Sequence, residues 1–92
     1  MSEYIAVDVE TGDDPEVIRL VTNLKLAPEG PESYTSRADG DEGSPLAQAL
    51  FGIEGLDALE IAENILVVRR APDVEWYDLV DDITEALKDF FL

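Results

Sequence analysis

Residues 44–70, SPLAQALFGIEGLDALEIAENILVVRR, decide the fold because they carry a helix and a hairpin in immediate succession. Ser44 offers a hydroxyl that can cap a helix, and Pro45 suits the first helical position. The apolar residues that then share one helical face are Leu46, Ala49, Leu50 and Ile53. Gly55 ends the pattern. These signals predict a short helix with one buried face.

Two β-rich runs follow this helix, at residues 56–61 (LDALEI) and 65–70 (ILVVRR). The three residues between them, Ala-Glu-Asn, leave room only for a tight turn, so the runs predict an antiparallel hairpin. A second hairpin is expected upstream. Residues 4–9 (YIAVDV) alternate in the manner of a half-buried strand, TGDDPE is a turn cluster, and β-branched residues resume at residues 17–24 (VIRLVTNL).

The last 22 residues, APDVEWYDLVDDITEALKDFFL, predict a long amphipathic helix. Asp73 is its expected N-cap, and Glu75 suits the positive end of the helix dipole. The apolar stripe consists of Trp76, Leu79, Val80, Ile83, Leu87 and Phe90. A place on this stripe makes Trp76 a core residue rather than one that stacks on a ligand, and we expect the same of Phe51, Phe90 and Phe91.

The order of these elements defines the fold class. Residues 27–43 are rich in turn-forming residues and predict a long exposed connection, in which a brief SYTS segment could form a short edge strand. The expected order is therefore β-β-α-β-β-α. We predict a two-layer α+β fold: a mostly antiparallel, four-stranded sheet with both helices packed on one face, forming a single domain over residues 1–92.

The acidic segment DGDEG, residues 39–43, raises the question of a metal loop. An EF-hand loop needs acidic ligands at positions 1, 3 and 5, glycine at 6 and glutamate at 12. Counted from Asp39, positions 5, 6 and 12 hold Gly43, Ser44 and Leu50, so the pattern fails. We expect an ordinary loop before a capped helix and no metal or cofactor site, with a weak, adventitious cation site as the alternative.

The charge and composition exclude several classes of protein. The 92 residues include 22 acidic and 6 basic side chains, for a formal charge of −16. Such a field repels nucleic acid and anionic membranes and attracts basic partners. No run approaches the roughly 20 apolar residues of a membrane span, and the N-terminus lacks a basic start followed by an apolar run. We therefore expect a cytoplasmic protein that binds neither nucleic acid nor membrane.

The second half of the chain resembles the N-terminal domain of Nfu/NifU-type iron–sulfur scaffold proteins. The resemblance covers a Ser-Pro-Leu-Ala helix opening, an Ile-Glu-Gly turn, an Ile-x-Val strand segment and an acidic-Trp helix start. In this chain they are Ser44, Pro45, Leu46 and Ala47, then Ile53, Glu54 and Gly55, then Ile65 and Val67, and finally Glu75 and Trp76. Upstream, DPEVIRL at residues 14–20 is similar to the family's Asn-Pro-Asn-Thr-Leu-Lys-Phe segment only loosely.

The resemblance implies a stand-alone accessory domain that interacts with proteins of iron–sulfur cluster assembly or delivery. Full-length scaffolds hold the cluster on a Cys-x-x-Cys pair in a separate C-terminal domain, and this chain has no cysteine. Because thiolates hold iron–sulfur clusters, the resemblance does not imply that this chain carries one.

The polar side of the last helix is the expected partner-binding surface. Asp78, Asp81, Asp82 and Glu85 lie off the apolar stripe, and so does Asp89. Like charges spaced i,i+4 cost roughly 0.2–0.5 kcal/mol per pair, which suggests that something other than stability favours them. The alternative is a solvated acidic face adapted to a salty cytoplasm, with a binding role unrelated to iron–sulfur proteins.

An enzyme is the remaining class. Adjacent carboxylates such as Asp13–Asp14 and Asp81–Asp82 could in principle do acid–base work, but such pairs are expected among 22 acidic residues. The chain has no histidine, cysteine or phosphate-binding loop, and a domain this small rarely encloses a deep pocket. We predict no enzymatic activity and name no catalytic residue.

Overall fold

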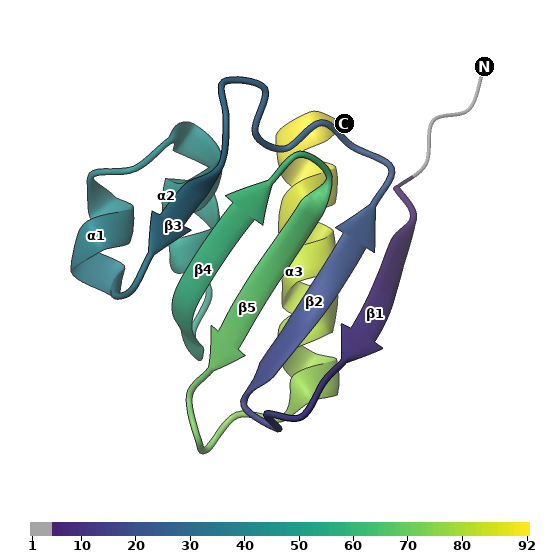
Figure 1. Ribbon diagram of the computed structural model, residues 1–92, viewed down its shortest axis with the longest axis vertical. Helices are drawn as coiled ribbons and strands as arrows, with labels where there is room; N and C mark the ends of the chain where they lie inside the picture. Colours follow the sequence, from purple (N-terminus) through teal and green to yellow (C-terminus); the bar gives the residue numbers. More distant parts are fainter. Residues whose placement is uncertain (1–4) are drawn as a thin grey trace.

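The computed structural model describes residues 5–92, and Tyr4, the expected start of the first strand, lies outside the described residues. The elements in chain order are β1 (Val7–Thr11), β2 (Val17–Thr22), β3 (Glu32–Tyr34), α1 (Arg37–Asp41), α2 (Pro45–Phe51), β4 (Leu56–Ala62), β5 (Ile65–Arg70) and α3 (Trp76–Phe91). The fold is α+β, with α2 and α3 behind the sheet in Figure 1.

The sheet has five strands in the order β1-β2-β5-β4-β3, and every neighbouring pair is antiparallel. Both predicted hairpins, β1–β2 and β4–β5, are confirmed. The prediction of four strands was wrong by one. Three residues of the expected connection, Glu32–Tyr34, pair with Leu59–Ile61 of β4 and form the edge strand β3.

Helix α1 was not predicted, because its sequence RADGD contains a glycine and two aspartates that disfavour helix. Tertiary contacts hold this single turn in place. The Arg37 guanidinium donates to the carbonyl oxygens of Phe51, the last residue of α2, and Ile53, just beyond the helix. At Gly40 a Cβ would lie 2.0 Å from Cδ2 of Phe51, so only glycine lets the two helices approach this closely.

Helix α2 begins as predicted, since the Ser44 hydroxyl accepts from the Ala47 N–H and Pro45 follows. The helix ends earlier than expected, at Phe51 with Gly52 as its C-cap. Its buried residues are Leu46, Ala47, Leu50 and Phe51, so the expectation that Ala49 faces the core was wrong. Gly55 lies beyond the helix with φ 94°, in the turn that leads into β4.

Helix α3 starts at Trp76 with Glu75 in the N-cap position, and not with Asp73 as predicted. The segment before the helix, residues 71–74, forms a turn. The Val74 N–H donates to Ala71 O, and the Arg70 guanidinium donates to Val74 O. This turn delays the start of the helix. Leu79, Ile83 and Leu87 are buried as the stripe predicts, whereas Phe90 is 44% exposed.

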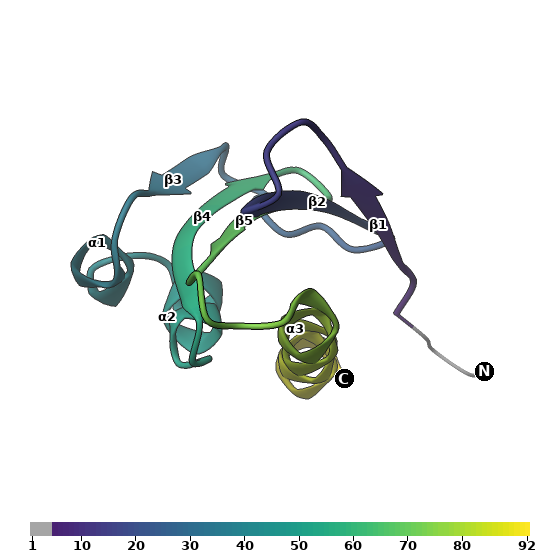
Figure 2. The ribbon, with the colours of Figure 1, turned by 90° about the horizontal axis from the view of Figure 1, so that it is seen from below.

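The core lies between the sheet and its two covering helices. Figure 2 shows α2 and α3 on one side of the arched sheet and no helix on the other. Leu20, Leu59, Ile61, Leu66 and Val68 of the strands are buried in the same cluster as Leu46 and Leu50 of α2 and Leu79, Ile83 and Leu87 of α3. The predicted two-layer architecture, with the covering helices on one face, is therefore confirmed.

The turn at Gly55 yields a stability prediction. Gly55→Ala should lower the free energy of unfolding by roughly 1–3 kcal/mol, because φ 94° strains an L-residue and the new Cβ would lie 2.5 Å from Cγ2 of Val74. Gly12→Ala is the matched control, since no atom lies within 4 Å of its Cβ position, and should change stability by less than about 0.5 kcal/mol. Denaturant titration measures both, and equal midpoints for the two variants would contradict this reading of the turn.

Candidate functional site

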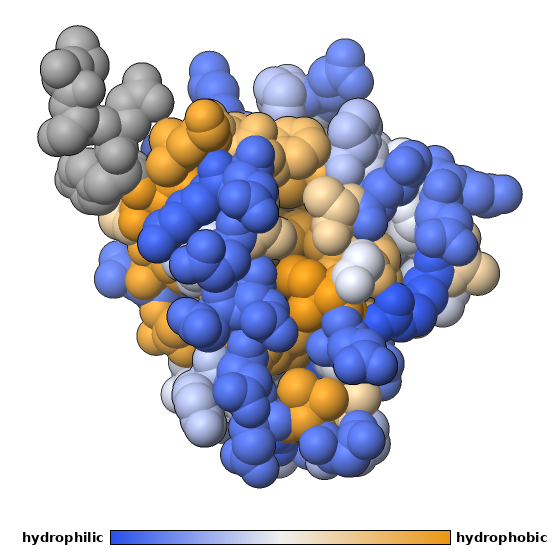
Figure 3. Space-filling model, turned by 180° about the vertical axis from the view of Figure 1, so that it is seen from behind, coloured by the Kyte–Doolittle hydropathy of each residue, from blue (hydrophilic) through white to orange (hydrophobic). Residues whose placement is uncertain are grey.

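The outer side of α3 carries the four carboxylates expected to bind a partner. Asp78, Asp81, Asp82 and Glu85 are all exposed, on the side of the helix opposite the buried stripe of Leu79, Ile83 and Leu87. We call these four residues the acidic face. Figure 3 shows the helix side of the molecule, where a hydrophilic band runs along α3 with apolar surface on both sides of it. Packing of the stripe therefore fixes the direction of the carboxylates.

Within residues 5–92, little neutralises the acidic face. The one ion pair described for it joins Lys88 Nζ to Glu85 Oε1 at 3.7 Å, with both side chains about half exposed or more. Exposed pairs of this kind contribute about 0–1 kcal/mol. Asp78 lies in the first turn, where the helix dipole favours a negative charge, but Asp82 and Glu85 have no such compensation.

The acidic segment around Asp39 has a structural role. Oδ2 of Asp39 accepts hydrogen bonds from the Thr35 N–H at 3.2 Å and the Thr35 hydroxyl at 2.8 Å. The Asp39 carboxylate therefore stabilises the backbone just before α1. Across residues 5–92, no three acidic side chains are grouped in a way that could hold a metal ion. The segment is thus a helix with its flanking turns.

Trp76 is part of a structural cluster at the start of α3. Its Nε1 donates to the Pro15 carbonyl oxygen at 2.8 Å, and the Arg70 guanidinium lies 5.3 Å from its ring centroid. Arg70 Nε in turn lies 3.3 Å from Glu16 Oε2. These contacts join the β1–β2 turn to the start of α3. The ring also packs against the core, as predicted, and its polar atom serves the fold.

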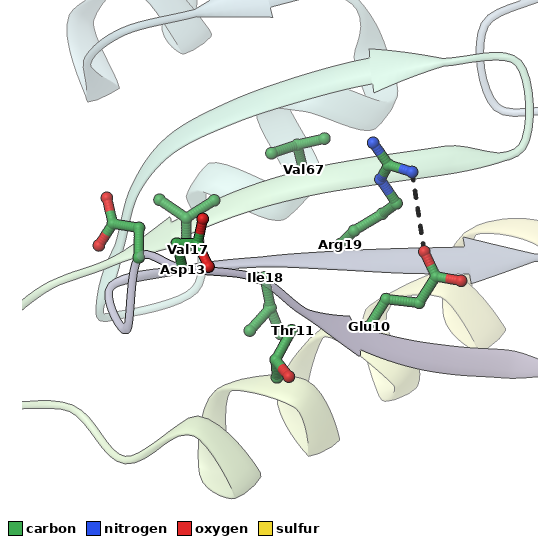
Figure 4. Close-up of a pocket in the computed structure, with 9 residues that line it drawn as sticks. Glu10, Thr11, Asp13, Val17, Ile18, Arg19 and Val67 are labelled. Atoms are coloured by element: carbon green, nitrogen blue, oxygen red, sulfur yellow. Dashed lines mark ion pairs between the residues drawn. The ribbon is translucent and has the colours of Figure 1, made fainter.

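The side of the sheet away from the helices carries a second group of functional candidates, which we call the open face. Figure 4 shows Val17, Arg19 and Val67 on this side, while Ile18 points the other way, towards the helices. Together with the β1–β2 turn they line a hollow of about 390 Å³, and Arg19 Nη1 lies 3.7 Å from Glu10 Oε1 at its rim. Arg69, on the same face, lies 3.3 Å from Asp14.

None of the site residues predicted from the sequence lies on the open face. The run ILVV at the start of β5 was a usable signal, because an antiparallel strand with one solvated face usually alternates between apolar and polar residues. Arg19 lies beside Val67 because β2 pairs with β5. These two strands are separated by two helices and two strands in the sequence. Local patterns do not specify such a pairing.

Comparison with known proteins identifies the family. The model of the family described as "Scaffold protein Nfu/NifU N terminal" matches residues 7–92. The chain therefore belongs to this family, as the sequence resemblance indicated. A curated relative, "NFU1 iron-sulfur cluster scaffold homolog, mitochondrial" from Drosophila ananassae, is 24% identical over 85 residues, which cover 90% of this chain and 30% of the relative. The chain thus spans about a third of the length of this curated relative.

Solved structures show the same fold. The crystal structure of protein SAV1430 from Staphylococcus aureus has a TM-score of 0.70 at 10% identity and covers 88% of this chain and 96% of its own. The solution structure of SeR13 from Staphylococcus epidermidis has a TM-score of 0.57 at 13% identity and covers 90% of this chain and 94% of its own.

In residues 5–92, no helix is long and apolar enough to cross a membrane.

The spacing of the acidic face yields a second prediction. Asp81→Asn with Asp82→Asn removes the Asp81/Glu85 and Asp78/Asp82 repulsions, so the double variant should be more stable at low salt by roughly 0.4–1 kcal/mol. About 1 M sodium chloride should shrink the gain by screening.

The matched control removes the same charge elsewhere, through Glu54→Gln and Asp57→Asn, both exposed and outside α3. Thermal unfolding measures all three proteins, and the control should gain less because its carboxylates are not spaced i,i+4 on a helix. An equal rise in melting temperature for both variants would show that total charge matters and helix spacing does not.

Proposed function

We propose that this chain is a non-catalytic interaction domain that assists iron–sulfur cluster assembly or delivery without holding the cluster. The family match over residues 7–92 carries the proposal, because it links nearly the whole described chain to iron–sulfur scaffold proteins. The likeness to the NFU1 scaffold homolog supports the same link. The absence of cysteine from all 92 residues supports an accessory role, since cluster binding depends on thiolate ligands.

We further propose that the acidic face binds the protein partner. Asp78, Asp81, Asp82 and Glu85 are exposed on one side of a 16-residue helix, so they are presented on a rigid element. Only Glu85 of the four is in an ion pair described for the chain, an exposed one with Lys88, so the acidic face can still attract lysine and arginine side chains. Charge of this kind acts mainly by raising the association rate and by rejecting acidic competitors. The partner is therefore a protein with a basic or mixed-charge surface, within iron–sulfur assembly or among its clients.

A solvated, salt-adapted surface is the competing explanation. It is favoured by the wide distribution of charge, since exposed carboxylates also occur on α1, on β1 and in the β1–β2 turn. The two explanations differ in what they require. An interaction domain needs a recurring partner whose binding depends on α3, whereas a solvated surface needs no partner.

The binding test starts with capture of partners from the native host on the immobilised chain at about 0.15 M and about 1 M salt, followed by kinetics with the purified captured protein. The variant Asp78→Asn/Asp82→Asn/Glu85→Gln should lower the association rate by roughly tenfold and leave the dissociation rate nearly unchanged. These residues lie off the core stripe, so the melting temperature should not fall.

The control variant Asp41→Asn/Glu54→Gln/Asp57→Asn removes the same charge from exposed positions outside α3 and should slow association far less. A partner whose binding ignores both salt and the α3 variant would contradict the assignment of the acidic face. Recovery of no recurring partner at either salt concentration would favour the solvated surface.

A further inference from the structure

We propose that the open face of the sheet is a docking surface for a second copy of this chain, packed sheet to sheet. The helices cover the other side, and Figure 2 shows no helix over the open face. This proposal is independent of the acidic face, which lies on the opposite layer. Four observations carry it: the apolar pattern of the central strands, the hollows around Val67, the charge register across the sheet and the area available.

The central strands are apolar on both faces. In β5, Leu66 and Val68 are buried in the core, whereas Ile65 and Val67 lie on the open face and are only partly buried. The partly buried open-face residues of the neighbouring strands are Val17 and Val21 of β2 and Ala58 and Ala62 of β4. Strands that are apolar on both sides are typical of sheets covered on both sides. This pattern indicates a cover that the single chain does not provide.

The surface around Val67 is hollowed. Three separate depressions of about 390, 290 and 180 Å³ all include this valine in their lining. The first lies towards the β1–β2 turn, and the other two lie towards β3 and β4. Val67 is thus at the centre of an apolar surface with several shallow depressions. Side chains from a facing sheet would fill these depressions.

The register places charges on either side of this centre in a self-complementary order. Val67 is paired with Arg19 of β2 on one side and with Glu60 of β4 on the other. A two-fold axis that runs parallel to β5, midway between the two facing sheets and over Val67, lays β2 of one copy over β4 of the other. Arg19 of each copy then faces Glu60 of its mate, and Val67 faces Val67. Self-complementarity of this kind is what an isologous dimer interface requires.

The distribution of charge is compatible with association through this side of the molecule. Two of the six basic residues, Arg19 and Arg69, lie on the open face, where they form ion pairs with Glu10 and Asp14 of their own chain. A charge of −16 on each chain opposes any association. In a dimer packed through the open faces, the two acidic faces lie on opposite outer sides, more than ~20 Å apart. This separation exceeds the Debye length of roughly 8 Å, so salt screens the repulsion between them.

The available area suits a weak dimer. Five strands of three to seven residues form a sheet of about 24 Å by 20 Å at most, or about 500 Å² of plane per copy. Two such faces together reach about 1,000 Å², which is close to the lower limit for a specific interface. A dissociation constant in the micromolar range is therefore expected.

Sedimentation velocity of the full chain tests the proposal across roughly micromolar to millimolar protein concentrations, the range over which an interface of this size dissociates. A monomer–dimer equilibrium is expected, and it should tighten between about 0.15 M and about 1 M sodium chloride because salt screens the repulsion between the chains. Val67→Lys should abolish the dimer. Val9→Lys, the same change on the helix side of β1 where Val9 is 48% exposed, should preserve it.

A charge swap provides the decisive comparison. Arg19→Glu and Glu60→Arg should each weaken the dimer by at least about tenfold, and the double variant should recover most of the loss. Melting temperatures of dilute samples show whether each variant is folded. A chain that stays monomeric throughout, a dimer that survives Val67→Lys, or a double variant no tighter than the single ones would overturn the proposal.

Discussion

The apolar stripe of α3 packs against the sheet, and the rest of the molecule is organised around this contact. Leu79, Ile83 and Leu87 are fully buried in one cluster with Leu20 of β2 and with Leu66 and Val68 of β5. The helical period then leaves the acidic residues no direction except outward. A chain with 22 acidic and 6 basic residues can fold because its carboxylates are kept on the solvent side of this contact. The contact that stabilises the fold therefore also presents the acidic face.

The two layers give the molecule two different surfaces. The helix layer presents carboxylates on α3, which suit long-range attraction of a basic partner. The sheet layer presents valines and alanines, with Arg19 and Glu60 on either side of Val67, which suit short-range packing. A dimer through the open faces would place two acidic faces on opposite sides of one particle. Such an arrangement would raise the avidity for a partner with two basic sites without any new contact.

Local patterns predicted the parts of the structure that depend on local rules. The two hairpins, the Ser44 cap and the burial of Leu79, Ile83 and Leu87 on α3 follow from residue periodicity and turn chemistry, and all are confirmed. Strand β3, helix α1 and the late start of α3 depend on distant contacts, namely the pairing with β4, the Arg37 hydrogen bonds and the turn held by Arg70. The exposure of the acidic face could be predicted for the same reason as the stripe. The apolar run ILVV of β5 signals the open face, but the charge order on that face could not be predicted, because it arises from the register of β2 and β4 on β5.

Carbodiimide cross-linking in an extract of the native host tests the central claim most directly, because this reagent joins a carboxylate to a lysine only when the two are in contact. If the acidic face binds a partner, mass spectrometry should find cross-links from Asp78, Asp81, Asp82 or Glu85 to lysines of one recurring protein, and about 1 M salt should abolish them. Cross-links spread evenly over the 22 acidic residues, with no recurring protein, would contradict the claim and identify α3 as an ordinary solvated surface.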